Sequence, residues 1–437
     1  SAINSYATRK KNIRIYLLID EYDNFTNTIL STYGTEFYRK ATHGEGFIRG
    51  FFNVIKSATT GTGAALERLF ITGVSPVTMD DVTSGFNIGT NITNDSWFND
   101  LVGFSENELR EMLEYYKEQG VLQESIDEIV AMMKPNYDNY CFSEDTLEQC
   151  MFNSDMALYF LKSFVLHHKK PKEIVDPNIR TDFNKLAYLI KLDHGLGENF
   201  SVIKEIAEQG EIITDIVTHF SALEMTDPSN FKSLLFYFGL LSIKGVDMVG
   251  RPILHVPNLV VREQLFNFLI QGYIKHDIFK IDMNKMSALF ENMAFRGDWK
   301  PLFDFIANAV REQSRIREYI EGEAHIKGFL LAYLGMYRYY QLYPEYELNK
   351  GFADFFFKPS LSVPVLPPFT YLLEVKYAKA GASEKEIRAL ADEAREQLLR
   401  YSEDELVAEA KAKGELKLIT IVWRSWELAL LEEVTLS

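Results

Sequence analysis

The sequence has few cysteines and no long hydrophobic run. Among its 437 residues are two cysteines, Cys141 and Cys150, too few for a disulfide framework or a cysteine-based zinc site. No segment approaches the roughly 18 uninterrupted apolar residues that a membrane-spanning helix needs. The first residues also lack the features of a secretory signal peptide. These absences predict a cytoplasmic protein with no membrane partner.

Positive charge is also scarce. The 46 Lys and Arg residues are outnumbered by 62 Asp and Glu residues, and the net charge is −16. Proteins that coat nucleic acids without sequence preference need clustered Lys and Arg to contact the phosphates. The balance argues against such a protein, but not against one that contacts nucleic acid through a local basic groove and a bound metal. Any contact with DNA or RNA is expected to be confined to one surface.

Two apolar runs near the carboxyl end contain charged side chains. Residues 351–357 include Asp354, and residues 371–377 include Glu374 and Lys376. Runs rich in Phe, Tyr, Leu and Val between Gly and Pro are typical of buried strands. Because side chains alternate between the two faces of a strand, Glu374 and Lys376 are expected to point the same way.

A charge in a buried strand is costly unless it is paired or binds a metal. If Asp354 lies on the strand next to Glu374, the two carboxylates converge with the Lys376 ammonium. Carboxylate oxygens suit Mg²⁺ or Mn²⁺, and an ammonium beside a scissile phosphate would stabilise developing negative charge. The alternative is that these are strand-end charges in an ordinary α/β domain.

The order Asp354, a gap, then Glu374-x-Lys376 resembles the core motif of the PD-(D/E)XK nuclease superfamily. The flanking segments resemble its other core elements: an opening helix at 322–330 and a further strand at 416–423. A helix at 394–401 carries Gln397 and Tyr401 one turn apart, like the helix that follows the Glu-x-Lys strand in many members. Two features depart from the family: Phe352 replaces a common Arg, and residues 359–368 are long for a hairpin.

The resemblance implies metal-dependent phosphodiester hydrolysis, with DNA a better candidate substrate than RNA by analogy. Asp354 and Glu374 would bind Mg²⁺ or Mn²⁺, and Glu323 on the opening helix is a third candidate carboxylate. Lys376 would steady the attacking water and the transition state, and Gln397 would orient water or phosphate.

The amino-terminal part begins with another apolar run. Residues 13–19 are followed by Asp20 and Glu21. A run without alternation is typical of a parallel strand covered on both faces, and α/β sheets bind ligands at the carboxyl ends of such strands. The segment resembles a Walker B element, in which Asp20 would hold the nucleotide's Mg²⁺ through water and Glu21 would polarise the attacking water. The alternative is a structural strand end.

A second parallel strand is predicted at 69–76, after a helix at 47–57. In relatives this is the sensor strand, so Thr72 and Ser75 at its polar end are candidate nucleotide contacts. Several segments resemble the bacterial predicted AAA-ATPase-like family that carries a PD-(D/E)XK nuclease at its carboxyl end, namely 70–76, 83–88, 103–108, 231–241 and 256–263.

The phosphate-binding loop of an ATPase is absent from the sequence. No G-x-x-x-x-G-K-[ST] motif is present, and Gly61-Thr62-Gly63 is too short and has no Lys. In the family this loop lies well over a hundred residues before the Walker B strand, so we expect it to belong to a preceding amino-terminal part. ATP-Mg²⁺ binding is therefore expected only of a longer chain, and little ATPase activity of this one.

The middle of the chain is predicted to be helical. Helices are expected at 105–119, 124–133, 154–167 and 181–189, and residues 229–267 suggest a winged-helix-like unit. That unit lacks basic residues at the recognition positions, so we expect it to pack rather than to bind DNA.

Together the patterns predict an α/β protein of three regions. These are the carboxyl half of an AAA-ATPase-like α/β domain (1–104), a helical region (105–300) and a PD-(D/E)XK nuclease-like α/β domain (301–437). The ATPase region would contact a second copy of the chain or a partner protein. The alternative function is a non-catalytic regulatory or binding module built on a degenerate nuclease fold.

Overall fold

The computed structural model describes residues 14–59, 66–76, 89–169, 171, 174–175, 198–225, 227–276, 278–313, 320, 322–348, 351–360, 363 and 365–435. The chain forms two compact units, each described by itself below. The first comprises residues 1–123, 137–202 and 212–257, and the second comprises residues 124–136, 203–211 and 258–437.

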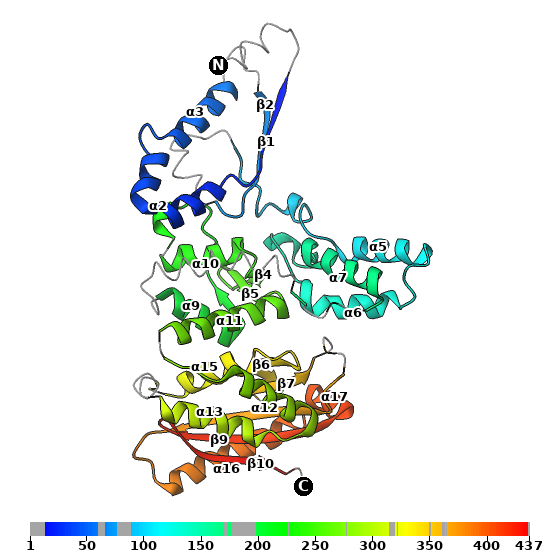
Figure 1. Ribbon diagram of the computed structural model, residues 1–437, viewed down its shortest axis with the longest axis vertical. Helices are drawn as coiled ribbons and strands as arrows, with labels where there is room; N and C mark the ends of the chain where they lie inside the picture. The colour runs from blue at the N-terminus through cyan, green and yellow to red at the C-terminus, as the bar shows by residue number, and fades with distance from the viewer. Residues whose placement is uncertain are drawn as a thin grey trace. The chain divides into compact units, whose positions relative to one another are not determined.

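The first unit begins with a pair of parallel strands. β1 (Ile15–Ile19) and β2 (Leu66–Ile71) pair so that Leu17 lies opposite Leu69. α2 (Asn24–Thr42) and α3 (Phe47–Thr59) connect the two strands (Figure 1). The strand–helix–strand order expected from the sequence is therefore observed, with α2 as an addition. β2 ends at Ile71, so Thr72 and Ser75 follow the strand instead of lying within it.

The expectation that β1 is covered on both faces is wrong for the described residues. Ile15, Leu17 and Ile19 pack with Phe52 and other apolar residues of α3 and β2. The alternate side chains Tyr16 and Leu18 remain 66% and 74% exposed. The physical reason is that α3 packs against only one face of the two-stranded sheet. Every second apolar side chain of β1 therefore points away from α3 and stays exposed.

The middle helices agree well with the sequence-based expectations. Ser105 forms a capping box with Glu108 at the start of α5, as the early acidic residues indicated. The expected helix at 181–189 lies outside the described residues. In the first unit the helices and short 3-10 turns of this part are η1 (Ser96–Phe98), α5 (Glu106–Glu118), η2 (Glu144–Thr146), α7 (Ser154–His167) and η4 (Ala222–Glu224). Nearly all of α6 (Ile126–Tyr137) and most of α9 (Glu198–Gln209) belong to the second unit.

The helix–strand–strand–helix order of the winged-helix-like segment is also observed. α10 (Pro228–Tyr237) precedes the antiparallel hairpin of β4 (Ser242–Val246) and β5 (Pro252–His255), and β3 (Glu211–Ile213) joins that sheet beside β5. α11 (Leu259–Lys275) follows and begins at an Asn258 cap. Within the second unit α11 packs on α15, with the Tyr273 and Phe329 rings 5.0 Å apart.

The second unit is built on a five-stranded sheet in the order β10-β9-β8-β7-β6. Only β8 and β9 pair in parallel, and α16 and α17 make the crossover that a parallel pair needs. The expected helix, two strands, helix and strand all appear, with β6, α17 and β10 added. The bounds are α12 (Met283–Arg296), α13 (Lys300–Glu312), α15 (Glu323–Leu334), β6 (Tyr340–Leu348), β7 (Gly351–Pro359), β8 (Phe369–Ala378), α16 (Glu384–Tyr401), α17 (Glu405–Lys413), β9 (Glu415–Arg424) and β10 (Glu427–Val434).

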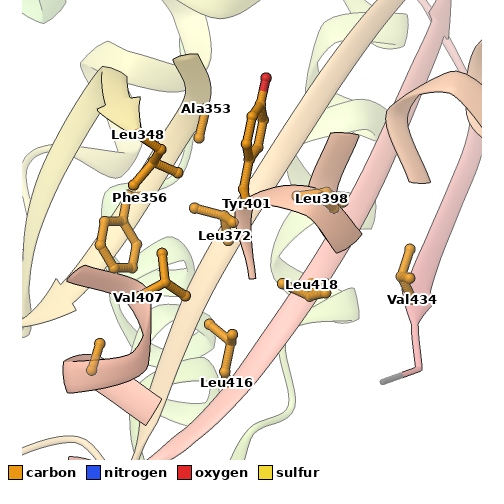
Figure 2. Close-up of a cluster of buried hydrophobic side chains, with 11 residues drawn as sticks. Leu348, Ala353, Phe356, Leu372, Leu398, Tyr401, Val407, Leu416, Leu418 and Val434 are labelled. Carbon is orange, nitrogen blue, oxygen red and sulfur yellow. The ribbon is translucent and has the colours of Figure 1, made fainter. Parts of the chain in front are cut away.

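Helices cover both faces of this sheet. On one face the Tyr371 hydroxyl donates to the Met293 carbonyl of α12 at 2.7 Å. On the other face α16 packs against β8 and β9 (Figure 1). The apolar cluster on the α16 side draws on strands and both crossover helices (Figure 2); its buried members are Leu348, Ala353, Phe356, Leu372, Leu398, Tyr401, Val407, Ala410, Leu416, Leu418 and Val434.

Candidate functional site

The two candidate carboxylates of the second unit lie where β7 and β8 separate. The last paired residues are Phe355 and Leu373. Asp354 and Glu374 are the next residues beyond this pair, one on each strand. There the Asp354 side chain takes the place of a backbone carbonyl of the sheet: its Oδ2 accepts a hydrogen bond from the Val375 N–H at 2.6 Å. Asp354 and Glu374 are only 5% and 2% exposed, so the strands bring two buried carboxyl groups together.

Asp354 is held from both sides. Its Oδ2 bonds to the backbone of β8, and its Oδ1 lies 2.5 Å from the ammonium of Lys327 on α15. Lys327 also contacts the carboxylates of Glu323, at 3.0 Å, and Glu345, at 3.1 Å. Glu323, the candidate third carboxylate, is thus connected to Asp354 through a lysine.

Glu374 has the opposite environment. Its Oε1 atom is buried and has no hydrogen-bond partner. Burial raises the pKa of Glu374 to about 9, the charge of Asp354 and a side-chain hydrogen bond with it add to the rise, and Lys376 and Lys327 oppose it. A buried polar atom without a partner costs about 1–3 kcal/mol, so this oxygen requires an explanation.

Gln397 supplies a second oxygen of the same kind. It lies on α16, and its Oε1 atom is also buried without a partner. The carboxyl oxygens of Asp354 and Glu374 are hard donors of the type that Mg²⁺ and Mn²⁺ prefer, and an amide oxygen such as that of Gln397 belongs to the same chemical class. A divalent cation bound by Asp354 and Glu374 would satisfy the unpartnered carboxyl oxygen, so the residues present fit such an ion. Within the described ranges no group of three or more His, Cys, Asp and Glu side chains is arranged to hold a metal ion.

Lys376 lies close to this centre but is held by a different partner. Two residues beyond Glu374 on β8, its ammonium contacts the Glu393 carboxylate of α16 at 3.1 Å, and its side chain is 14% exposed. Its positive charge nevertheless lowers the pKa of Glu374, against the stronger effects of burial and Asp354. The ammonium is therefore held near the carboxyl groups without pairing with them.

Tyr401, one turn after Gln397, closes the site from the α16 side. Its ring belongs to the apolar cluster, and its hydroxyl points away from Val407 and Leu416 (Figure 2). Burial and the Glu374 charge raise its pKa. Gly351 allows this approach, because its φ of +139° is unfavourable for other residues and a Cβ there would lie 2.8 Å from the Tyr401 oxygen.

Two site residues were missed by sequence reasoning. Lys327 follows Glu323 by four residues on one helix, and that spacing alone would have placed both side chains on the same face. Glu345 carried no comparable signal, because it lies in β6, which the sequence did not predict, at a left-handed φ of 42°.

The carboxylates of the first unit are arranged differently. Asp20 Oδ1 accepts hydrogen bonds from the Glu21 N–H, at 3.0 Å, and from the Thr72 hydroxyl. β1 and β2 therefore bring Asp20 and Thr72 together at their carboxyl ends. Glu21 is exposed, adopts a left-handed φ of 51° and accepts a hydrogen bond from the Asn24 side chain at 3.0 Å.

Ser75, the other candidate nucleotide contact, is bound to a different carboxylate. Its N–H and its hydroxyl both donate to Asp23 Oδ2 at 3.2 Å, and the Val74 N–H donates to Oδ1. Asp23 is 3% exposed and was not singled out from the sequence. Its two oxygens fix the loop after β2 against the loop after β1.

Comparison with protein families gives two matches. Residues 321–433 match the family described as PD-(D/E)XK nuclease superfamily, and residues 1–83 match the family described as Predicted AAA-ATPase. No curated protein matches the chain. In the described part of the chain no helix is both long enough and apolar enough to cross a membrane.

Proposed function

Because the chain joins an AAA-ATPase-like segment to a PD-(D/E)XK nuclease segment, we propose that it is a metal-dependent nuclease that cleaves DNA. The superfamily match supports phosphodiester hydrolysis, and PD-(D/E)XK nucleases generally use divalent metal ions. The preference for DNA over RNA rests on analogy with the superfamily. Mg²⁺ or Mn²⁺ would serve as the cofactor.

The positions of the side chains support the following proposed roles. Asp354 and Glu374 would hold the divalent cation, with Gln397 contributing its amide oxygen or orienting the water. When bound, such an ion polarises the phosphate and lowers the pKa of a coordinated water. Lys376 would stabilise the negative charge that develops on the reacting phosphate, because its ammonium lies beside the carboxyl groups without neutralising them. Glu323 would act from the edge of the site, through Lys327.

The observation that carries the proposal is the unpartnered, buried Oε1 of Glu374. An ordinary α/β core would bury a Leu at this position or pair the carboxylate with a donor. Here a second carboxyl group stands beside it, and the positive charges present do not reach this atom with a hydrogen bond. A bound cation would give this oxygen a partner and would offset the repulsion between the two carboxyl groups.

A cleavage assay tests the function. The protein is stripped of metal and then incubated with Mg²⁺, Mn²⁺ or a chelator on single- and double-stranded DNA and RNA. We expect metal-dependent cleavage of DNA, and none with the Glu374→Gln protein prepared in parallel. Cleavage that persists in the chelator, or that the Glu374→Gln preparation shows equally, would reject the proposal.

The second candidate function is a regulatory module whose nuclease fold no longer cleaves. It is favoured by one observation: the Lys327 ammonium already neutralises Asp354. In that case the protein would bind nucleic acid or a partner without turnover. Absence of cleavage on all four substrates, together with retained binding to one of them, would favour this alternative.

For the amino-terminal region we propose that Asp20 and Thr72 face the Mg²⁺ of a nucleotide, with Glu21 and Ser75 nearby, in a chain that also carries a phosphate-binding loop. The hydrogen bond between Asp20 and Thr72 supports this pairing. We also propose three functional regions, ATPase-like (1–104), helical (105–300) and nuclease (301–437), with the first contacting a second copy or a partner protein.

A further inference from the structure

Lys327 is surrounded by carboxylates in the nuclease segment. Its ammonium lies 2.5 Å from Asp354, 3.0 Å from Glu323 and 3.1 Å from Glu345. Its side chain is only 19% exposed. A further pair approaches from α9, where Lys204 lies 3.7 Å from Glu208, a carboxylate whose pKa is raised by burial.

The ammonium of Lys327 contacts the same carboxylate that is proposed to bind the metal. It contacts Oδ1 of Asp354, the oxygen that is not already used by the Val375 N–H. Three carboxylate groups within 3.1 Å of the ammonium stabilise its charged form. Asp354 therefore has a permanent monovalent partner on its free oxygen.

We propose that Lys327 is a resident counter-cation that competes with the divalent metal for Asp354. This inference rests on the metal-dependent function proposed above. A divalent cation on Asp354 Oδ1 would lie within a few ångströms of the ammonium, and like charges at that distance repel strongly in a buried site. Metal binding therefore requires Lys327 to release Asp354.

The structure provides a place for the released ammonium. Glu323 is four residues earlier on the same helix, and Glu345 faces it from β6, so both can keep Lys327 paired after Asp354 is released. The four-carbon side chain of a lysine can make this shift without movement of the helix. Meanwhile Ile326 and Phe329, on either side in sequence, are buried and keep α15 in place.

A purely structural lysine predicts a different outcome from a competing one. If Lys327 only held the carboxylates in place, its removal would disorder the site and weaken metal binding. If it competes, its removal frees Asp354 and tightens metal binding. The sign of the change in affinity thus separates the two roles.

The test is calorimetric titration of Mn²⁺ into the metal-free full chain and its variants. We expect Lys327→Met to bind Mn²⁺ about tenfold more tightly, the size expected when a charged hydrogen bond no longer has to be broken. Lys327→Arg keeps the charge and should bind as the parent does. The matched control is Lys358→Met, which removes the same charge from a lysine that contacts Tyr346 and aromatic rings on β6 and β7.

Equal or weaker binding by Lys327→Met than by the parent overturns the inference. Tighter binding by Lys358→Met to the same degree also overturns it, because net charge alone would then explain the gain. If the parent binds no Mn²⁺ but Lys327→Met does, the competition is supported; if neither binds, the inference and the proposed metal site fail together. A parent that binds Mn²⁺ without cleaving any substrate would reject the proposed function and leave the inference standing.

A second measurement does not depend on the folding of a variant. Lysine acetylation of the parent, followed by mass spectrometry, reports how strongly each ammonium is engaged. We expect Mn²⁺ to raise the modification rate of Lys327 relative to Lys358 in the same sample, because Lys327 then has two carboxylate partners instead of three. An unchanged ratio would contradict the release of Asp354.

Discussion

The two carboxylate sites of the chain have opposite designs. At the end of β1, Asp20 and Glu21 are exposed and their oxygens accept hydrogen bonds from nearby donors. Between β7 and β8, Asp354 and Glu374 are buried, and one oxygen has no partner. The sheets differ in the same way, since helices cover both faces of the five-stranded sheet, whereas Tyr16 and Leu18 of β1 are exposed. A buried carboxyl oxygen without a hydrogen-bond partner is stabilised when a cation binds to it. An exposed carboxylate that already accepts hydrogen bonds gains less from the same cation.

The largest expected effect is a loss of metal-dependent cleavage when the carboxylates of the second unit, but not those of the first, are changed. Asp354→Asn and Glu374→Gln should each lower metal-dependent cleavage by about a hundred- to a thousandfold, because the charge that holds the cation is lost. Asp20→Asn should leave cleavage within about twofold of the parent, since Asp20 belongs to the other unit and accepts its hydrogen bonds from Glu21 and Thr72. Initial rates on a labelled duplex measure all three. Equal losses in all three variants would contradict the division of roles.

Lys376→Ala should separate binding from turnover within the second site. The ammonium pairs with Glu393 and not with the carboxyl groups, so its removal should leave the Mn²⁺ dissociation constant within about threefold. Cleavage should fall by about a hundredfold, because the charge on the reacting phosphate is no longer stabilised. Calorimetry and single-turnover rates on one preparation measure both quantities. A variant that loses metal binding to the same extent as turnover would assign Lys376 to the metal site instead.

The two buried carboxyl groups should also differ in metal-free stability. Asp354→Asn should lower the free energy of unfolding by about 2–3 kcal/mol, less than is usual for a broken buried pair because Lys327 keeps two other partners. Glu374→Gln should change it by less than about 1 kcal/mol, since the raised pKa leaves this carboxyl protonated and uncharged at neutral pH. Urea unfolding in a chelator measures both values. Equal destabilisation would mean that the two carboxyl groups share one environment.

The raised pKa of Glu374 also predicts how metal-free stability depends on pH. The folded state holds this proton up to about pH 9, whereas the unfolded carboxyl releases it near its ordinary value of 4.5. The unfolded state therefore binds fewer protons between these values, so the contribution of Glu374 is complete below pH 4.5 and is lost as pH rises towards 9. We expect the stability difference between parent and Glu374→Gln to shift against the parent over this range. A difference that is constant from pH 5 to 9 would show that Glu374 titrates normally.

The smallest expected effect lies in the first unit. Thr72→Val removes the hydroxyl that donates to Asp20 and should lower stability by only about 0.5–1 kcal/mol, because the group is exposed and water can replace it. Asp23→Asn should cost more, since its buried carboxylate accepts three hydrogen bonds from Val74 and Ser75. Thermal unfolding of both variants ranks them. The reverse order would contradict the interpretation of Asp23 as the residue that fixes the loops.

Strand pattern and motif spacing were enough to predict that two carboxyl groups lie side by side on β7 and β8. The alternation of β8 and the position of Asp354 in β7 follow from local sequence, and pairing of the two strands places both carboxyl groups at one point. The helix at 394–401 and the strand at 416–423 were likewise predicted, from their resemblance to the family's core elements, and α16 and β9 confirm them. The assignment of chemical roles to these residues stays a prediction.

What the sequence did not reveal depends on contacts between distant segments. The ion pair between Lys327 of α15 and Asp354 of β7 joins two separate elements, and no local pattern predicts it. Asp23 binds Ser75 across 52 positions of the chain. The exposed face of β1 was missed for a related reason, because an apolar run does not tell whether one or two layers will cover it.

The central claim is that Asp354 and Glu374 bind one divalent cation, and titration of Mn²⁺ into the metal-free chain tests it most directly. The account predicts a single site per chain in the parent protein and its loss in Glu374→Gln, while Asp392→Asn, an exposed carboxylate change on α16, should bind as the parent does. Binding of Mn²⁺ by Glu374→Gln with the affinity of the parent would contradict it.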